Sequence, residues 1–409
     1  MKRLVVTGGR LAIQLAGLIS LPLLYLLEPF WKIRFGTMYT QRFGHLAQNH
    51  DVFLRLLQRD GYPKRTSYFV FGHDPANRQL FDMLTRTRPF YASRWMTRIM
   101  FAWRPIYRNT RFWLQLRFSG NEQRLFNETD PVIAFTPEEI AYGNGKLREM
   151  GIGADDWFVC MHARDTSYLR EWRPEYADAW DKVDFKNASI ESYVKAAEYI
   201  AAQGGFVLRY GAVVEKPFPV TDNPRIIDYA TKHRSDFMDI FLAAHCRFFL
   251  ATSSGPCGVP TMFNRPVIIG NHFPYTHTHY RADDLIVPRP VLDNETGEPV
   301  PFYEALNNGF YVWDATTQEV SSKGANMELY RWGENSADDL RDSCADMMAS
   351  LGNEPVDPAA QRVQEAYREL YLSHLSDPEM GAKIAPSYAL RHRDLIVPPE
   401  SPLHQAADD

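Results

Sequence analysis

Short apolar runs alternate with helix-like segments between residues 158 and 269, and this alternation limits the fold more than any other feature. Continuous apolar runs are typical of strands that helices cover on both faces of a parallel sheet. The helix-like segment 190–202 carries its apolar residues at helical spacing and ends at Gly204. The pattern predicts an α/β fold with a doubly wound parallel sheet. Its predicted strands cover residues 158–161, 206–210, 225–229, 248–251 and 266–269.

The first of these runs changes character at its end. Apolar residues continue to Met161, and His162, Arg164 and Asp165 follow. Ligands of open α/β sheets bind at the carboxyl ends of strands, which is where this change puts charged side chains. An arginine there suits a phosphate, because its planar guanidinium stays charged and donates two hydrogen bonds. The alternative is an ion pair between Arg164 and Asp165 at a domain surface.

Two further strands of the same predicted sheet also end in polar residues or glycine. The turn Ser253-Ser254-Gly255 stands between a buried strand and a proline-started helix. It offers hydroxyls, free N–H groups and a helix dipole together, which makes it an anion site. Each cluster by itself is more often structural, but three of them on one sheet predict a phosphate-binding cleft. The predicted phosphate-binding residues of this sheet are His162, Arg164, Arg209, Gly211, Thr252, Ser253, Ser254 and Gly255.

A glycine also precedes a helix in the N-terminal half of the chain. Gly44 lies between Arg42 and His45, and apolar residues at helical spacing follow as far as Asp60. Such a turn points backbone N–H groups and the positive end of the helix dipole at whatever lies in front. An ordinary strand-to-helix turn is the alternative. Strands are predicted nearby at residues 67–72 and 131–135.

The run Leu11–Leu27 is almost wholly apolar, and cations flank it on both sides, among them Arg10 and Lys32. Its length is borderline for a spanning helix, and the two-sided positive charge leaves its orientation undecided. The following Phe30-Trp31 pair is typical of interfacial residues. We expect a membrane-anchoring or in-plane helix. A cleaved signal peptide, a true span and an ordinary core helix are the alternatives.

Composition excludes several classes of function. The net charge of −5 argues against a nucleic-acid binder that works by bulk electrostatics. The four cysteines are far apart without a CxxC spacing, which favours buried free thiols over disulfides or a zinc site. The sequence contains no Walker A pattern, no GxGxxG and no DxD. We therefore predict neither a metal nor a bound cofactor.

Five segments in a fixed order resemble a bacterial group of glycosyltransferases from surface-polysaccharide loci. They are residues 41–47, 162–165, 209–211, 234–239 and 251–255. The layout is more distantly similar to fucosyltransferases of the GT-B fold, of both the α1,6 and the protein O-fucosyl types. The resemblance covers roughly residues 36–272. It implies a GT-B-like fold, with two Rossmann-like domains facing a cleft, an N-terminal apolar helix and C-terminal helices.

Position by position, the resemblance implies that Arg164 binds the diphosphate of a nucleotide-sugar donor. Ser253 and Ser254 would then hold phosphate oxygens, and Asp236 would belong to the donor-side helix. Gly44 and His45 would approach the same cleft from the first domain. The chain has Asp165 where the α1,6 enzymes have a second arginine, so GDP-fucose is not carried over as the donor.

The expected organisation has four parts. Residues 1–35 are a membrane-associating helix, 36–152 a Rossmann-like acceptor-side domain, 153–335 the nucleotide-sugar-binding domain with an insertion at 281–331, and 336–409 the C-terminal helices and tail. A peripheral hairpin is the alternative for residues 281–331. Gly151 and Gly153 mark the expected hinge between the two domains.

Transfer from a nucleotide sugar expels a diphosphate, and an arginine with a helix N-terminus can neutralise that charge as it develops. The acceptor hydroxyl needs a base, for which His45, Asp165 and Glu171 are equal candidates. We expect an inverting, metal-independent enzyme at the cytoplasmic face of the inner membrane, acting on a glycan or lipid-linked acceptor. A non-catalytic nucleotide- or glycan-binding scaffold is one alternative. A phosphate-ester hydrolase that uses His162 or His45 is the other.

Overall fold

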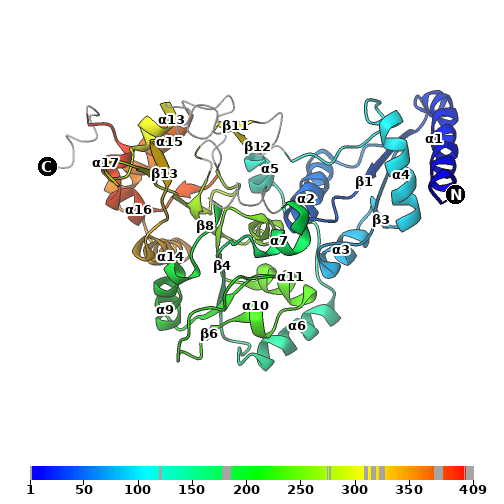
Figure 1. Cartoon of the computed structure of the whole chain (residues 1–409). Coiled ribbons are helices and arrows are strands. Elements are labelled where there is room, and N and C mark those ends of the chain that lie inside the picture. The colour runs from blue at the N-terminus through cyan, green and yellow to red at the C-terminus, as the bar shows by residue number, and fades with distance from the viewer. Residues whose placement is uncertain are drawn as a thin grey trace. The chain divides into compact units, whose positions relative to one another are not determined.

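The computed structural model describes residues 2–118, 122–176, 186–273, 275, 278–307, 312–314, 319–321, 328–372, 381–399 and 401. They form two units (Figure 1). Unit 1 comprises residues 2–118 and 128–137, and unit 2 comprises residues 122–127 and the chain from 138 onward.

Unit 1 is built on a three-stranded parallel sheet in the order β1-β2-β3. Its strands are β1 (Lys32–Thr37), β2 (Thr66–Gly72) and β3 (Phe90–Ala92), and its long helices are α1 (Lys2–Leu27), α2 (Phe43–Asp60), α3 (Arg78–Thr85) and α4 (Arg94–Tyr107). Two helices begin where a side chain can cap them, because Asn77 accepts from the N–H of Leu80 and Ser93 from that of Met96. The predicted strand 67–72 and the predicted N-terminal apolar helix are both confirmed.

Unit 2 contains a seven-stranded sheet in the order β14-β9-β8-β7-β4-β5-β6, in which every pairing is parallel. Its strands are β4 (Phe158–His162), β5 (Phe206–Arg209), β6 (Ile226–Ile227), β7 (Phe249–Thr252), β8 (Val267–His272), β9 (Leu285–Pro288) and β14 (Lys383–Ile384). The α/β fold with parallel sheets is therefore confirmed, and all five predicted strands of this sheet are present.

The strand order reverses at β4. From β4 the chain moves outward through β5 to β6, then returns to β7 on the other side of β4 and continues to β8 and β9. Right-handed crossovers then place the connections of the two halves on opposite faces of the sheet. In agreement, α9 (Val194–Ala202) packs beside α14 (Ala337–Leu351), while α11 (Asp236–His245) packs beside α12 (Gly258–Met262). The border between β4 and β7 is thus the topological switch point.

Shorter elements connect and extend this sheet. The helices are α5 (Gln123–Glu128), α6 (Pro137–Glu149), α7 (Ser167–Trp172), α10 (Tyr229–Lys232), α13 (Phe302–Asn307), α15 (Pro358–Leu372), α16 (Pro386–Arg391) and α17 (Arg393–Ile396), with 3₁₀ turns η1 (Pro174–Tyr176), η3 (Ile190–Tyr193) and η4 (Gly255–Cys257). The remaining strands are β10 (Val291–Asp293), β11 (Val312–Asp314), β12 (Glu319–Ser321) and β13 (Tyr330–Trp332).

The boundary between the units differs from the expected hinge at Gly151–Gly153. Helix α6 belongs to unit 2, because Gly143 lies against the ring of Phe241 on α11 and the ring of Tyr142 meets that of Phe237 edge-on at 4.8 Å. A Cβ at position 143 would come within 2.3 Å of Phe241, so the glycine permits this close packing. The chain crosses between units at residue 137 instead.

Three other expectations are corrected. Residues 131–135 form no strand, although Ile133 is buried. The supposed insertion 281–331 contains β9, a fully buried strand of the main sheet, and β10, which pairs with β13. The C-terminal part, expected to consist of helices and a tail, also supplies a strand, since β14 pairs with β9 after the two predicted helices. Apart from Ser401, the tail after Glu400 lies outside the described residues.

Candidate functional site

The carboxyl ends of β4 and β7 lie side by side at the switch point, with His162 paired to Ala251 in register. The backbone N–H of Arg164 donates a 3.0 Å hydrogen bond to Oγ1 of Thr252. The loop after β4 and the last residue of β7 are therefore joined directly. This is the edge at which open α/β sheets bind their ligands, and two of the predicted clusters meet there.

The guanidinium of Arg164 is held by a residue that sequence reasoning passed over. Its Nη1 donates to Oδ1 of Asn187, and the carbonyl of Asn187 accepts a 2.9 Å bond from Nη1 of Arg289. Arg289 is 4% exposed and also donates to the carbonyl of Gly333 at 2.6 Å. A half-buried network anchored on the buried Arg289 thus supports Arg164. No local sequence signal marks Asn187. It lies in the chain between β4 and β5, and only folding brings it to Arg164.

The carboxylate of Asp165 accepts hydrogen bonds from the backbone of two different segments. One carboxylate oxygen accepts from the N–H of Ser167 at 2.9 Å, at the start of α7. The other accepts from the N–H of Glu215 at 3.0 Å, in the loop after β5. The described contacts of Asp165 are structural, which counts against it as a freely available base.

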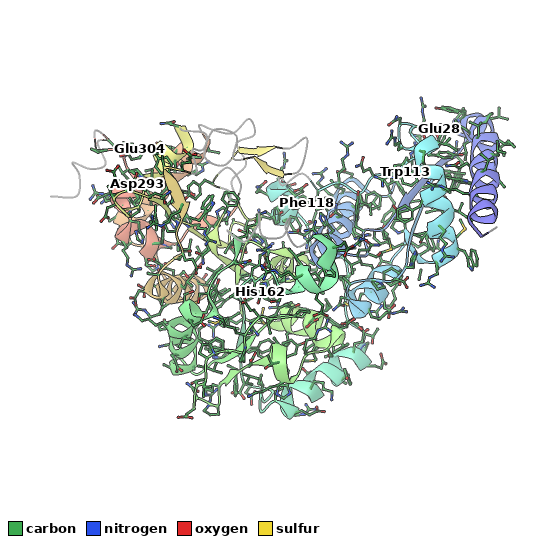
Figure 2. All side chains as sticks on the ribbon, viewed as in Figure 1. Glu28, Trp113, Phe118, His162, Asp293 and Glu304 are labelled. Carbon is green, nitrogen blue, oxygen red and sulfur yellow. The ribbon has the colours of Figure 1, made fainter. Side chains whose placement is uncertain are left out.

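His162 is half-buried at the end of β4 and is labelled in Figure 2. Its Nδ1 lies 3.1 Å from the carbonyl of Tyr210, which can only accept, so Nδ1 carries the ring proton. The pKa of His162 is lowered to about 4, mainly by burial; Arg209 and Arg164 also lower it, whereas the Tyr210 carbonyl and Asp165 act in the opposite direction. The imidazole is neutral at pH 7, so it offers an acceptor at Nε2 and no positive charge.

Arg209 and Gly211, at the end of β5, have structural environments. Arg209 is 2% exposed, forms an ion pair with Asp228 at 3.5 Å and donates to the carbonyl of Lys216 at 3.0 Å. A Cβ on Gly211 would meet the side chain of Val214 at 2.6 Å, so the loop needs a glycine there. These contacts fit the structural alternative for this cluster, and binding of a donor by either residue stays a prediction.

The hydroxyls of the Thr252–Ser254 turn are not equivalent. Thr252 is completely buried, and its Oγ1 accepts from Arg164. Ser254 donates its hydroxyl proton to the carbonyl of Thr252 at 2.9 Å. The Ser253 hydroxyl accepts a hydrogen bond from the N–H of Phe273 at 3.3 Å. Among the described residues, no acceptor is seen for the proton of this hydroxyl. Only Ser253 combines accessibility with a proton to donate to a phosphate oxygen.

The helix after this turn is short. Gly255 begins the 3₁₀ turn η4, and only the five residues of α12 follow it. Ser254 also uses its N–H, which donates to Sγ of Cys257 at 3.3 Å. A helix of this length contributes less dipole than a long one, so anion binding at this turn would rely mainly on the Ser253 hydroxyl and the N–H of Gly255. Pro256 has no N–H, and that of Cys257 donates to the carbonyl of Ser254.

Asp236 lies in the first turn of α11, where Ser235 caps the helix by accepting from the N–H of Met238. Asp236 accepts from Nη2 of Arg234 at 2.6 Å, and the same guanidinium binds Asp239 at 2.9 Å. Burial raises the pKa of Asp239 to about 6 despite Arg234 and the 2.8 Å hydrogen bond from Tyr229. Asp239 was not singled out from the sequence, although its spacing from Asp236 puts both in the first turn.

Gly44 and His45 belong to unit 1. They lie inside the first turn of α2, which begins at Phe43, and not in a turn before it. Nδ1 of His45 lies 3.0 Å from Oδ1 of Asn49, an acceptor, so Nε2 is the nitrogen with a free lone pair. Burial lowers the pKa of His45, which keeps the ring neutral at pH 7.

Within the residues that the structure describes, no three His, Cys, Asp or Glu side chains gather as they would around a metal ion. All four cysteines are buried free thiols, as predicted. The expectation that the chemistry needs no metal stays a prediction.

Comparison with known proteins gives a distant likeness only. No family model matches the chain, and no curated protein matches it. A glycosyl transferase family 9 protein from Veillonella parvula is 12% identical with a TM-score of 0.40, over 63% of this chain and 86% of that one. The E. coli heptosyltransferase WaaC, solved with ADP-2-deoxy-2-fluoro heptose, is 9% identical with a TM-score of 0.36, over 63% and 94%. The iron-containing dodecameric glycosyltransferase TibC of enterotoxigenic E. coli is 14% identical with a TM-score of 0.33, over 66% and 65%. At this level the likeness assigns no function.

Proposed function

We propose that this chain is a glycosyltransferase that moves a sugar from a nucleotide-sugar donor to a glycan or lipid-linked acceptor in bacterial surface-polysaccharide synthesis. One observation carries the proposal. At the switch point of unit 2, Arg164 is tied to Thr252 through its backbone and held by Asn187 through its guanidinium, and Ser253 follows Thr252 directly in the chain. A fixed arginine with a hydroxyl donor on this edge is suited to a diphosphate.

The chemistry that this site would perform is electrostatic. The bond between the anomeric carbon and the donor phosphate breaks, and the diphosphate leaves with the electron pair. The acceptor oxygen forms the new bond to that carbon and gives its proton to a base. Arg164 would neutralise the charge that grows on the leaving group, and a preorganised guanidinium does so without reorganisation. Attack from the opposite face would give inversion, without a metal.

His45 of unit 1 stays a candidate base, as the resemblance implies. Both oxygens of Asp165 are occupied by backbone N–H groups, and Glu171 stands on the exposed side of α7. The neutral ring of His45 carries its proton on Nδ1 toward Asn49, so its Nε2 can accept the proton of an acceptor hydroxyl. The acceptor would be met at the cytoplasmic face of the inner membrane.

The test begins with thermal shift of the full chain against nucleoside diphosphates and ADP-, GDP- and UDP-linked sugars. Stabilisation by one nucleotide, followed by hydrolysis or transfer of its sugar, supports the proposal. Stabilisation without any turnover in the presence of acceptor glycans would indicate the non-catalytic scaffold. Turnover of simple phosphate esters without a sugar nucleotide would indicate the hydrolase and overturn the proposal.

A further inference from the structure

One face of the apolar helix α1 is packed onto α4 of unit 1 (Figure 1). Two side chains of α4 donate to backbone carbonyls of α1. Trp103 Nε1 binds the carbonyl of Ile13 at 2.8 Å, and the hydroxyl of Tyr107 binds that of Gly17 at 2.9 Å. Ser20 lies 2.8 Å from the same hydroxyl. These bonds fix the rotation of α1 about its own axis.

The contact is close and forms part of the core of unit 1. A Cβ on Gly17 would come within 2.8 Å of the indole of Trp103, so only glycine lets the two helices approach this far. Leu24 packs with Tyr107 and Phe112, both of which are completely inaccessible to solvent. Removing α1 would therefore expose the core. A deletion of the N-terminal residues would therefore change folding and membrane binding together. A signal peptide that is cleaved off does not fit this packing either.

The other face of α1 is apolar and open to solvent. Ile19 is 76% exposed and Leu26 is 69% exposed. Helix α4 adds Trp95, which is 75% exposed. We call this face the α1–α4 surface; its exposed large apolar residues are Leu11, Leu15, Leu18, Ile19, Leu23, Tyr25, Leu26, Leu27, Phe30, Trp31, Trp95 and Phe101. Large apolar residues exposed in this number along one helix and on its neighbour mark a docking site for a partner or a membrane.

The segment that contains α4 is rich in arginine, although the whole protein has a net charge of −5. Residues 90–118, which include α4, contain six arginines and neither aspartate nor glutamate. The guanidinium of Arg98 lies 5.5 Å from the ring of Trp95, and that of Arg111 lies 5.7 Å from the ring of Tyr25. Cations placed beside exposed aromatic rings match the headgroup region of an anionic bilayer, where the rings enter the interface and the cations meet lipid phosphates.

The packing also decides between a helix that spans the membrane and one that lies in its plane. Residues Gly9–Leu27 are long and apolar enough to span by length and composition. A spanning helix would have to leave Trp103 and Tyr107, break both hydrogen bonds to its carbonyls and expose Phe112. A helix lying in the interface keeps all of these contacts and buries only its outer face.

We propose that α1 and α4 together form an in-plane docking surface for anionic phospholipid bilayers. The inference rests on unit 1 alone and does not depend on the reaction proposed for the chain. The apolar residues supply the burial, and the arginines supply preference for negative headgroups. The interaction is peripheral, and α4 takes part in it as well as α1.

The experiment is flotation of the purified full chain with vesicles of phosphatidylcholine alone or mixed with phosphatidylglycerol. We expect binding to the mixed vesicles, weakened by salt, because each basic residue near such a surface contributes to binding. The double variant Ile19→Glu/Leu26→Glu should lower partitioning by about tenfold or more, since it puts charge on the apolar face. Arg98→Gln/Arg111→Gln should lower binding to the mixed vesicles only. Val220→Glu, which changes a fully exposed apolar residue of unit 2, is the matched control.

Circular dichroism and melting temperature establish that each variant is folded. Unchanged vesicle binding by folded Ile19→Glu/Leu26→Glu would overturn the proposal. Resistance of the bound wild-type protein to extraction at alkaline pH would mean that α1 spans the bilayer. Sedimentation of the protein without lipid tests whether the surface is an interface between two copies. A wild-type dimer that the same double variant dissociates, with no vesicle binding, would make the surface an interface between two copies.

Discussion

The N–H of Arg164 binds Oγ1 of Thr252 at 3.0 Å, although 88 positions separate the two residues in the chain. This bond crosses the switch point, and the register between β4 and β7 places it there. It holds the loop that carries Arg164 against the turn that carries Ser253. The geometry of the proposed donor site is therefore set by the sheet, which is rigid, and not by the loops alone.

Replacement of Arg164 tests the mechanism. Arg164→Ala should lower donor-dependent turnover by about 10²–10³-fold, because it removes one preorganised charge stabiliser from the leaving group. Arg164→Lys should also be severely impaired, since lysine keeps the charge and loses the planar fork. The measurement is turnover beside melting temperature, with Arg148→Ala on the exposed side of α6 as control. A stable and fully active Arg164→Ala would put the donor site elsewhere; an unfolded one would make the residue structural.

Asn187 is predicted to position Arg164. Asn187→Leu removes the acceptor for Nη1 and should lower kcat roughly tenfold or more, in line with the loss of a hydrogen bond to a charged group. Asn187→Asp keeps an acceptor oxygen at the same place and should retain most of the activity. Steady-state kinetics on both variants separate positioning from general destabilisation. Equal loss in the two would contradict the role, because a structural defect would not be rescued by the carboxylate.

The two serines after β7 should respond differently. Ser253→Ala removes the proton that we assign to a phosphate oxygen, and should weaken binding of a nucleoside diphosphate about fivefold to tenfold. Ser254→Ala removes a hydroxyl already bound to the carbonyl of Thr252, so binding should change by less than about twofold. Isothermal titration measures both. The reverse order of effects would show that Ser254 is the ligand.

The lowered pKa of His162 predicts that the stability of the protein depends on pH. Its folded pKa is about 4, below its ordinary value of 6.5, because burial disfavours the charged ring. The unfolded chain therefore binds more protons between these values, and the contribution of His162 to stability is complete above pH 6.5 and lost as the pH falls toward 4. Denaturant unfolding at several pH values should show a steeper acid loss in the wild type than in His162→Gln. Parallel curves would refute the assignment.

Metal independence is the last prediction. Turnover should survive EDTA with less than about a tenfold loss, which corresponds to roughly 1.4 kcal/mol of barrier. The physical reason is that Arg164 and the turn after β7 are proposed to carry the leaving-group charge. Complete loss in EDTA with recovery in Mg²⁺ or Mn²⁺ would show that a cation shares this task.

Much of unit 2 was predictable because its strands are continuous apolar runs, and such runs are stable only between layers of helices. The polar residues at the ends of β4 and β7 were predictable for the same reason, since each run stops where the chain leaves the core. The helix starts at Asn77 and Ser235 depend on local capping, which needs only neighbouring residues. These are properties of short segments, so the order of the amino acids carries them.

Tertiary structure decided which strands are neighbours, and thereby which polar residues meet. The pentapeptide Asp-Leu-Ile-Val-Pro occurs twice in the chain and shows what a local sequence does not determine. At residues 284–288 it forms the buried strand β9, whereas at 394–398 it begins in the short helix α17. The sequence determined that both copies are apolar; pairing with β8 made one of them a strand. Asn187 beside Arg164, and Trp103 against Gly17, likewise depend on contacts between distant segments, which no local pattern encodes.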